Sequence, residues 1–411
     1  MIGRPGIPEH GPFFGTPGHR ADLLADAKAQ LDFFRPSLDP AGGFHAQGID
    51  GRPIAGTLRE LHATTRMVHS FALAHLAGFP DCEAVIDHGM DALWRFHRDG
   101  ARGGYRWSFA PGGAPADATR LAYGHAFVLL AGASAKMAGH PDADRLIEDV
   151  LDIIETRFWE RETGRMREEF AGDWQPLSAY RGMNANMHMS EALLAAFEAT
   201  GDRTFLARAR GIFDFFVGRM GSGHAWRLPE HFDEDWRVDR SYEGDPMFRP
   251  AGSTPGHSFE FARLILQLHA RTPDDTLLGW ARNLYDRALA DGWDGARGGL
   301  VYTVDPADGR TLRDNRYWWP VTEAIGAAAA LIKLGDDRHE DYRRFRQAAE
   351  RLFIDRVHGG WLPEARAADG STGTQFTGKP DLYHSLQAAL FPLAPGVAID
   401  AEGLRAIEAA G

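Results

Sequence analysis

The sequence predicts an all-α protein, an (α/α)6 barrel of twelve helices in which six apolar helices form the inner ring. Three observations support this fold class. A short turn signature recurs along the chain, apolar and charged helices alternate between its copies, and glycine-containing stops separate the helices of each pair. Because no linker-like stretch interrupts the pattern, we expect residues 1–411 to form a single domain.

The turn signature is one or two glycines followed by an apolar or aromatic residue. Its copies recur about every 60 residues, as expected for a repeat architecture, with one longer interval between the fourth and fifth. The third and fourth copies are degenerate. The copies lie at Gly42-Gly43-Phe44, Gly103-Gly104-Tyr105, Gly164-Arg165-Met166, Gly223-His224-Ala225-Trp226, Gly298-Gly299-Leu300 and Gly359-Gly360-Trp361.

Two kinds of helix alternate between these signatures. One is strongly apolar and stops at a glycine such as Gly78, Gly139 or Gly335, followed by Pro or Asp, which ends one helix and starts the next. The other is amphipathic, as in residues 342–354 with their Arg-rich outer face. Six such pairs that close on themselves form the barrel, and an open α-solenoid is the alternative.

The direction of the inner helices predicts where function lies. If all inner helices run the same way, their N-termini and the long loops that precede them share one face, where sites are usually placed. We expect the charged, aromatic and proline-containing stretch 226–254 to be an insert on that face, with a possible role as a lid.

Composition excludes several classes of function. A formal net charge of −12 argues against nucleic-acid binding, which needs a concentrated basic face. The single cysteine, Cys82, allows no internal disulfide. The first residues lack the apolar segment of a signal peptide, and no later run is long and apolar enough to span a membrane. We therefore expect a cytoplasmic enzyme, with oligomeric state left open between monomer and homodimer.

The inner helices bring polar and aromatic residues to their first turns before they become Ala- and Leu-rich. A lone histidine on an apolar helix is usually a packed core residue, and His69, His75, His125 and His269 are interpreted in that way. The concentration of the remaining groups at one end predicts a functional site, because burying them without a role is costly. These candidates are Arg66, Asn184, His188, Arg249, His257, Glu260, Trp318, Glu323, His384 and Gln387.

The chemistry of this set favours proton transfer on a neutral sugar. We expect no nucleotide cofactor, because no Gly-rich phosphate loop follows a strand. The single cysteine excludes a Cys–His zinc site, and a metal held by His257 and Glu260 is a minor alternative. Histidine titrates near neutrality, so a pair can act as base and acid. Tryptophan can pack against the C–H face of a sugar ring.

These motifs resemble the N-acylglucosamine 2-epimerase superfamily over nearly the whole chain. The resemblance rests on Phe-Arg-Pro and Thr-Pro-Gly-His-x-x-Glu within 248–260, and on the blocks 184–188, 318–323 and 383–387. The first block is similar to the aldose–ketose isomerase branch, which acts on mannose or sulfoquinovose. Two positions depart from the family pattern. Phe261 stands where Trp is common, and Val321 stands where Gln is common.

The resemblance implies a cofactor-free isomerase of a monosaccharide, with D-mannose as first choice. It implies that His257 and His384 are the acid/base pair, acting through a cis-enediol after ring opening. It also implies that the pocket is lined by Arg66, Asn184, His188, Arg249, Glu260, Trp318, Glu323 and Gln387.

Several alternatives stay open from the sequence. A sugar 2-epimerase of the N-acylglucosamine or cellobiose type shares the first step and differs in where the proton returns. A sulfoquinovose isomerase would act on a charged sugar. A glycoside hydrolase on the same barrel would use Glu260 and Glu323 as acid and base. A sugar-binding protein without activity would have no need of two histidines.

Overall fold

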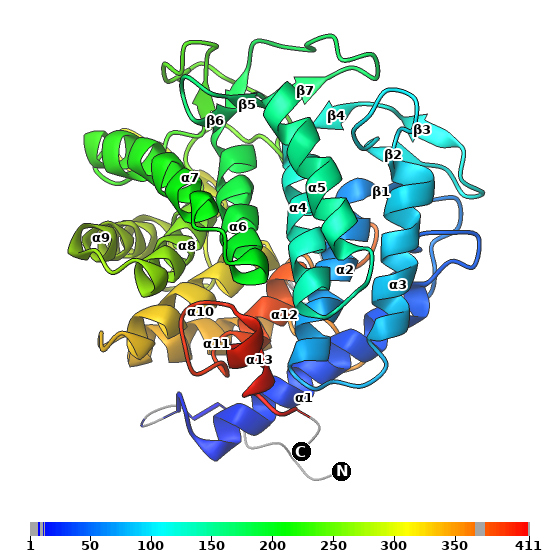
Figure 1. Ribbon diagram of the computed structural model, residues 1–411. Helices are drawn as coiled ribbons and strands as arrows, with labels where there is room; N and C mark the ends of the chain where they lie inside the picture. Colours follow the sequence, from blue (N-terminus) through cyan, green and yellow to red (C-terminus); the bar gives the residue numbers. More distant parts are fainter. Residues whose placement is uncertain (1–6, 9–10, 12, 366–374, 410–411) are drawn as a thin grey trace.

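The computed structural model describes residues 7–8, 11, 13–365 and 375–409, and within them helices follow one another in pairs around a common axis. One helix of each pair lies on the outside of the molecule and the next on the inside (Figure 1). The outer helices are α1 (Pro17–Phe34), α3 (Glu83–Ala92), α5 (Ala143–Ile153), α7 (Thr204–Phe213), α9 (Asp275–Gly292) and α11 (His339–Leu352). The inner helices are α2 (Leu61–Leu76), α4 (Ala122–Met137), α6 (Met183–Thr200), α8 (Pro255–Arg271), α10 (Trp318–Lys333) and α12 (Tyr383–Leu390).

The inner helices form a closed ring. Each contacts the inner helices of the neighbouring pairs, and α12 contacts α2. The predicted (α/α)6 barrel is therefore confirmed and an open solenoid is excluded. A short additional helix, α13 (Ala401–Arg405), packs against α2. Short helical turns follow four outer helices, namely η1 (Arg35–Ser37), η2 (Leu93–His97), η3 (Ile154–Phe158) and η4 (Asp214–Gly221).

The sequence of each helix explains which ring it joins. In α10, residues 324–331 are apolar on every side, and a helix without a polar face must be surrounded by protein. In α11 the buried residues recur on one face, as Tyr342, Phe345 and Leu352 do, while charged residues cover the other face. This helix begins at His339, earlier than the predicted residue 342.

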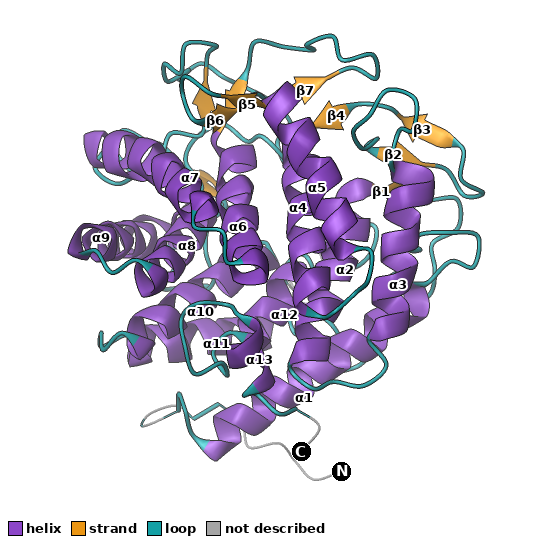
Figure 2. Cartoon of the chain, viewed as in Figure 1, coloured by secondary structure: helices purple, strands orange, loops and turns teal. Residues whose placement is uncertain are grey.

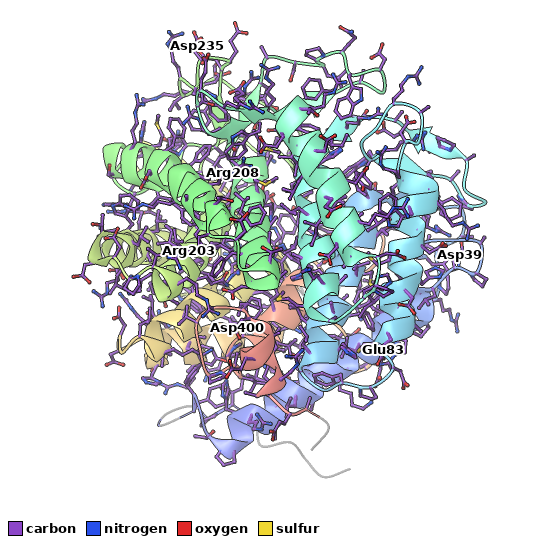
Figure 3. All side chains as sticks on the ribbon, in the orientation of Figure 1. Asp39, Glu83, Arg203, Arg208, Asp235 and Asp400 are labelled. Carbon is purple, nitrogen blue, oxygen red and sulfur yellow. The ribbon has the colours of Figure 1, made fainter. Side chains whose placement is uncertain are left out.

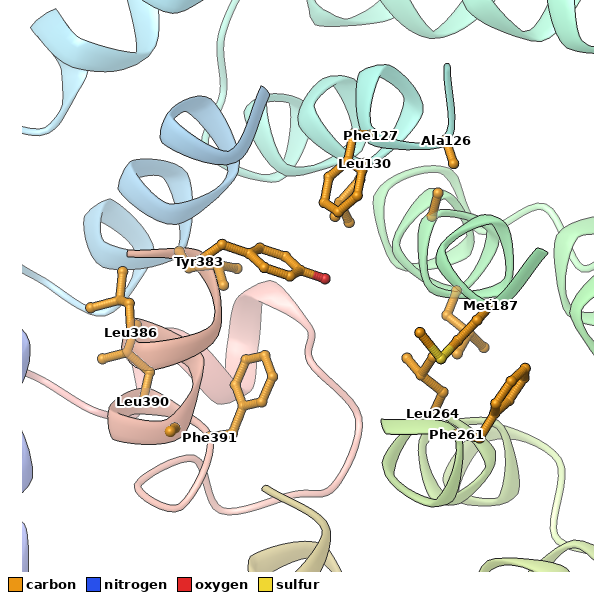
Figure 4. Close-up of a cluster of buried hydrophobic side chains, with 14 of the residues drawn as sticks. Ala126, Phe127, Leu130, Met187, Phe261, Leu264, Tyr383, Leu386, Leu390 and Phe391 are labelled. Atoms are coloured by element: carbon orange, nitrogen blue, oxygen red, sulfur yellow. The ribbon is translucent and has the colours of Figure 1, made fainter. Parts of the chain in front are cut away.

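The core runs through the inner ring, and the charged side chains lie outside it. Figure 4 shows Tyr383 of α12 pointing toward the middle of the ring, near Phe127 of α4 and across from Met187 of α6 and Leu264 of α8. Exposed charged side chains such as Arg203 project from the periphery (Figure 3). This division is what hydrophobic burial produces when the apolar helices are enclosed by amphipathic ones.

The long connections from outer to inner helices carry short antiparallel strands and gather at one end of the barrel (Figure 2). The strands are β1 (Arg59–Glu60), β2 (Ser108–Phe109), β3 (Pro115–Asp117), β4 (Arg120–Leu121), β5 (Trp159–Glu160), β6 (Arg165–Met166), β7 (Glu169–Phe170), β8 (Arg181–Gly182), β9 (His231–Phe232), β10 (Thr303–Val304) and β11 (Thr311–Arg313). Their pairings are β1–β2, β2–β3, β4–β7, β5–β6, β8–β9 and β10–β11.

The glycine signatures form the tight turns that begin these connections. At the second copy Gly104 has φ +73°, and a Cβ there would lie 2.7 Å from the ring of Trp174, so only glycine fits. The fourth copy differs from the prediction. Gly223 lies in helical backbone, and Ala225 and Trp226 take the positive φ values, 53° and 65°.

A buried ion pair anchors five of these connections. An acid just after the outer helix binds a basic residue that shortly precedes the next inner helix. The pair joins the turn to the start of the inner helix and so fixes where that helix begins. The pairs are Asp39–Arg59 at 2.7 Å, Asp99–Arg120 at 2.7 Å, Glu160–Arg181 at 2.8 Å, Asp294–Arg316, and Asp355–Lys379 at 2.8 Å.

The fourth connection has a different anchor, and it is the one that contains segment 226–254. Here Glu230 accepts a hydrogen bond from the backbone N–H of Thr254, directly before α8, at 2.6 Å. The segment is also tied to neighbouring connections, because Arg227 binds Asp291 at 2.7 Å and Tyr302 donates to the carbonyl of Met247. The stretch predicted as an insert thus lies on the long-loop face.

None of the helices in the described part of the chain has both the length and the apolar character needed to cross a bilayer.

We predict that Gly279→Ala stabilises the protein. Gly279 lies inside α9, and a Cβ added there would meet no heavy atom within 4 Å. Alanine should therefore raise the free energy of unfolding by about 0.5–1 kcal/mol, because it reduces the entropy of the unfolded chain without a clash. Urea unfolding followed by circular dichroism measures the change.

Gly218→Ala is the contrasting control for this prediction. Its Cβ would lie 2.4 Å from the ring of Trp280, so the same substitution should destabilise the protein. A Gly279→Ala protein that unfolds at lower urea than the wild type would contradict the prediction.

Candidate active site

The candidate residues lie at the N-terminal ends of the inner helices, beneath the long connections. On α8, His257, Glu260 and Arg263 follow one another at three-residue intervals and share one face of the helix. The same interval separates His384 and Gln387 on α12. These side chains therefore lie at successive depths in the barrel. The first of them lie at the end where the long connections gather, which we call the mouth.

The first histidine, His257, lies against a carboxylate and an indole ring. Its Nδ1 is 3.1 Å from Oε2 of Glu230, and its ring centroid lies 4.9 Å from that of Trp319 at 31°. Contact with His257 and the bond to Thr254 lower the pKa of Glu230 although burial opposes this. An ionised Glu230 holds the Nδ1 side of His257 and leaves Nε2 as the side available for chemistry.

The second histidine, His384, has the same kind of partner. Its Nδ1 lies 2.8 Å from Oε1 of Glu323, whose other oxygen accepts a hydrogen bond from Nε of Arg263 at 2.9 Å. Burial opposes ionisation of Glu323, but Arg263 and His384 outweigh it and lower its pKa. Burial lowers the pKa of His384, against the opposing effect of Glu323. His384 is thus a neutral base whose Nδ1 donates to a carboxylate.

Trp319 connects the two histidines. Its ring centroid lies 5.8 Å from that of His384, at an interplanar angle of 33°, and 4.9 Å from that of His257, at 31°. Trp318, the residue singled out from the sequence, is 5% exposed and packs edge-on against Phe376 at 5.6 Å. Trp319 therefore contacts both histidines, whereas the ring of Trp318 meets that of His384 edge-on at 6.4 Å.

Three buried carboxylates meet one level below the histidines. Oε1 of Glu260 lies 3.6 Å from Nδ1 of His188, and Oε2 of Glu191 lies 3.5 Å from the same atom. Burial, with Glu323 and Glu191 nearby, raises the pKa of Glu260 well above its usual range. Glu191 is ionised, because its bond to His188 and the charge of Arg263 lower its pKa despite burial. Glu260 is therefore a protonated acid beside two carboxylates.

Arg66 is held in a fixed orientation at the mouth. Its two terminal nitrogens donate to Asp381 and to the hydroxyl of Tyr123, each at 2.8 Å. Its guanidinium lies between the rings of Phe127 and Tyr383, with centroid distances of 4.7 and 4.8 Å. The charge of Arg66 is thus balanced within the protein, and its position does not depend on a ligand.

Arg249 and Asn184 lie on neighbouring elements of the same face. Arg249 donates to Glu169 at 2.8 Å, approaches Glu168 at 3.4 Å, and lies over the ring of Tyr180. Asn184 is partly exposed at the start of α6, and its buried Oδ1 has no hydrogen-bond partner among the described residues. Asn184 can therefore donate to or accept from a ligand.

Gln387 lies deeper than the other candidates. Its amide lies 3.2 Å from Nε2 of His69, whose Nδ1 lies 2.7 Å from the hydroxyl of Ser134. His69 also lines a small cavity of about 30 Å³ at the far end of the barrel, opposite the mouth.

His125, interpreted from the sequence as a packed core residue, bonds the N–H of Tyr105 and the carbonyl of Leu121, so its polar atoms are satisfied within the core.

Sequence reasoning missed the groups that hold the histidines. Glu230 lies in segment 226–254, where no periodicity identifies a partner for His257. Arg263 and Glu191 follow predicted residues by three positions, Glu260 and His188, so helical spacing alone could have identified them. Asp381, which holds Arg66, lies two residues before α12 and accepts a hydrogen bond from the backbone N–H of Tyr383, so it could have been found as a charge at the N-terminus of that helix.

Within the part of the chain that the structure describes, two groups of buried side chains have donor atoms close enough to hold a metal ion. They are His188, Glu191 and Glu260, and Glu260, Glu323 and His384, each with donor atoms within 4.8 Å of one another. The guanidinium of Arg263 lies among the same carboxylates. The pair suggested by the sequence, His257 with Glu260, is in neither group.

Comparison with known proteins gives matches over nearly the full length. A family model described as N-acylglucosamine 2-epimerase (GlcNAc 2-epimerase) matches residues 42–388. The D-mannose isomerase of Thermobifida fusca is 43% identical over 394 residues, which cover 92% of this chain and 96% of that protein.

Solved structures give the same result for the fold. A crystal structure of a D-mannose isomerase superimposes with a TM-score of 0.85 at 33% identity, covering 93% of this chain and 99% of the other. The cellobiose 2-epimerase of Spirochaeta thermophila DSM 6192 superimposes with a TM-score of 0.79 at 24% identity, covering 95% and 96% of the two chains. The second similarity concerns the fold alone.

We predict that acid destabilises this barrel between pH 6.5 and 4. Burial lowers the pKa of His69 and His188 to about 4, so between these values the unfolded chain binds more protons than the folded one. Stability therefore falls as the pH falls. His69 alone should account for about 2 kcal/mol between pH 7 and pH 5.

Urea unfolding at pH 7 and pH 5 measures this effect. His69→Gln should reduce the loss of stability between the two pH values by about 2 kcal/mol. Substitution of the exposed His358 by Gln is the control and should leave the loss unchanged. An equal loss in the wild type and in His69→Gln would show that His69 is not responsible.

Proposed function

This chain belongs to the N-acylglucosamine 2-epimerase family and is a sugar isomerase, and we propose that it interconverts D-mannose and D-fructose. The resemblance predicted from the sequence motifs is confirmed by the family match over residues 42–388. The proposed substrate is supported by the similarity to D-mannose isomerases over more than nine-tenths of the chain.

The observation that carries the proposal is the pair of histidine–carboxylate units beside one indole ring. His257, which lies against Glu230, and His384, which lies against Glu323, both pack on the ring of Trp319. Each carboxylate binds the Nδ1 side of its histidine, so both Nε2 atoms remain for proton transfer. A sugar whose C–H face packs on Trp319 would lie between two groups able to move protons.

The proposed reaction needs one proton moved between carbons and one between oxygens. After ring opening, His257 removes the proton from C2 of mannose and a cis-enediol forms. The same proton, or one exchanged for it on His257, is delivered to C1. His384 takes the proton from the O2 hydroxyl and supplies one to O1, so C1 becomes the CH2OH group and C2 becomes the ketone.

Two further groups suit the charge that develops along this path. Arg66 is held at the mouth by Asp381 and Tyr123, so it is oriented before substrate binds and can stabilise an enediolate oxygen. Glu260 carries a proton and can donate a hydrogen bond to a sugar hydroxyl. Asn184 and His188 complete the proposed contacts on the α6 side.

A neutral sugar fits the charges of the site better than a sulfonated or phosphorylated one. Arg66 is neutralised by Asp381, Arg249 by Glu169, and Arg263 by Glu323. An anionic group would have to break one of these pairs and leave a buried carboxylate unpaired, which is costly. This balance favours mannose over sulfoquinovose.

The hydrolase alternative is disfavoured by the state of its two carboxylates. Glu323 has one oxygen on Arg263 and the other on His384, so neither is free to act on a glycosidic bond. A hydrolase of either stereochemistry needs both members of its carboxyl pair for chemistry. A 2-epimerase would share the histidines and differ in the face of C2 that receives the proton.

We predict that the purified, EDTA-treated protein converts D-mannose to D-fructose in D2O. Proton NMR should show fructose without glucose, and deuterium at C1 of fructose measures how far the proton on His257 exchanges with solvent. Glucose formed before fructose would assign the chain to the epimerases. No turnover of mannose would contradict the proposal and make sulfoquinovose the next substrate to test.

We predict that His257→Ala and His384→Ala each lower kcat about 100- to 10,000-fold, the range of general acid–base assistance. His269→Ala is the matched control, because His269 lies at the opposite end of α8 and bonds Asp274 there. It should leave kcat unchanged. A variant of His257 or His384 that keeps more than about a tenth of the activity is not part of the acid/base pair.

We predict that Glu230→Gln lowers kcat about 10- to 1,000-fold, because His257 loses the carboxylate that fixes its tautomer and orientation. Glu234→Gln alters an exposed acid of the same segment and should have no effect. Initial rates with D-mannose measure both. A folded Glu230→Gln protein with wild-type kcat would show that His257 acts without this partner.

A further inference from the structure

Arg263 occupies the centre of the buried acids, and the proposed reaction does not use it. Its side chain is 3% exposed, and its Nε donates to Glu323 at 2.9 Å. Its Nη2 lies 3.6 Å from Glu191 and 3.9 Å from Glu260. Neither terminal nitrogen meets hydrogen-bond geometry with a partner among the described residues, so Arg263 acts on the ionised Glu191 by charge.

The acids around Arg263 are of the kind and spacing that hold divalent cations. Glu260 belongs to both groups of donor atoms that lie within 4.8 Å, one with His188 and Glu191, the other with Glu323 and His384. Nitrogen and carboxylate oxygen donors at this separation suit zinc and related ions. Several carboxylates buried together repel one another strongly unless a cation lies among them.

A glycine in the neighbouring inner helix α10 leaves space for the side chain of Arg263, and this glycine makes α10 less stable. Gly326 lies within α10, where glycine is less favourable than alanine. A Cβ added at Gly326 would lie 2.9 Å from Cδ of Arg263, so any larger residue would displace the arginine. On another side the guanidinium lies 5.5 Å from the ring of Phe391, a distance that suits a cation–π contact.

We propose that Arg263 is a positioning residue, a built-in counter-ion that takes the place of a divalent cation among these acids. Through its bond to Glu323 it orients the carboxylate that holds Nδ1 of His384. At the same time it neutralises part of the charge of Glu191 and lies beside the protonated Glu260. The kinetic part of this inference rests on the proposed function, whereas the metal-binding part does not.

The first test measures metal binding, without reference to activity. Arg263→Ala should bind one Zn²⁺ per chain from a stoichiometric Zn²⁺ solution, and the wild type should bind none under the same conditions. Isothermal titration, followed by elemental analysis after gel filtration, gives the stoichiometry. Arg263→Ala combined with Glu260→Gln should lose this ion, because Glu260 belongs to both donor groups.

The second test measures turnover of D-mannose. Arg263→Ala should lower kcat about 100-fold or more with little change in KM, since Arg263 orients His384 through Glu323 and does not touch the sugar. Guanidinium ion added to this variant should restore kcat about tenfold, as expected when a missing cation is replaced. Arg263→Lys keeps a charge and should lie between the wild type and Arg263→Ala.

Arg346 provides a matched control for the loss of a buried arginine. It is fully buried, bonds Asp22 at 2.8 Å and lies 3.6 Å from Asp26, between α1 and α11 and away from the mouth. Arg346→Ala should lower stability without creating the Zn²⁺ site. Gly326→Ala tests the geometry with the arginine retained, and should lower kcat because Arg263 is displaced.

Distinct results would overturn this inference. Zn²⁺ bound equally by the wild type and Arg263→Ala would show that the arginine does not take the place of a cation. Should Arg263→Ala not fold, wild-type kcat in both Arg263→Lys and Gly326→Ala would overturn the positioning role. If the wild type does not turn over mannose, the proposed function fails while the Zn²⁺ result still decides the inference.

Discussion

The buried or half-buried ion pair at the start of five of the six connections sets the geometry on which the rest of the molecule depends. In the second repeat, Asp99 follows the outer helix and Arg120 precedes the next inner helix, and their charges meet at 2.7 Å with the arginine fully buried. Burying such a pair adds little net stability, but losing one partner leaves an uncompensated charge and is severely destabilising. The pair therefore specifies position more than it contributes energy. Repeated around the ring, it fixes the first turn of the inner helices, which is where the site residues lie.

The site uses the same arrangement, in which a buried carboxylate holds a basic side chain in position, but with histidine in place of arginine. Each proposed acid/base histidine has a buried carboxylate on Nδ1, but the two carboxylates have different origins. Glu323 comes from a neighbouring inner helix and is itself bonded by Arg263, whereas Glu230 comes from a long connection and is bonded by the backbone before α8. His384 is thus supported by the rigid ring, and His257 by a loop. Both arrangements hold the ring nitrogens in place before any ligand arrives, which is the condition for effective proton transfer.

Much of this architecture could be predicted because helical repeats leave local signals. Apolar helices, glycine stops and turn signatures are properties of neighbouring residues, so the barrel and its functional face followed from the sequence. Candidate site residues could be proposed where each stands out on its own helix, as His257 and His384 do, and the structure places these two near one ring, that of Trp319. Contacts between repeats could not be predicted in this way. The contact of Glu230 with His257, the position of Arg263 among three acids, and the contacts of Trp319 with both histidines all depend on how distant segments meet.

In segment 226–254 one residue both anchors the connection and contacts a proposed acid/base histidine, and the other connections do not combine these two roles. Elsewhere the anchor of a connection is an ion pair outside the site, so the loop beyond it can vary in length or sequence without consequence for the histidines. Here Glu230 both anchors the loop, through Thr254, and holds His257. A relative or an engineered variant that exchanges this loop to admit a bulkier sugar must carry an equivalent carboxylate with it. Exchange of this loop and retention of the Nδ1 partner of His257 are therefore coupled requirements, joined in the single residue Glu230.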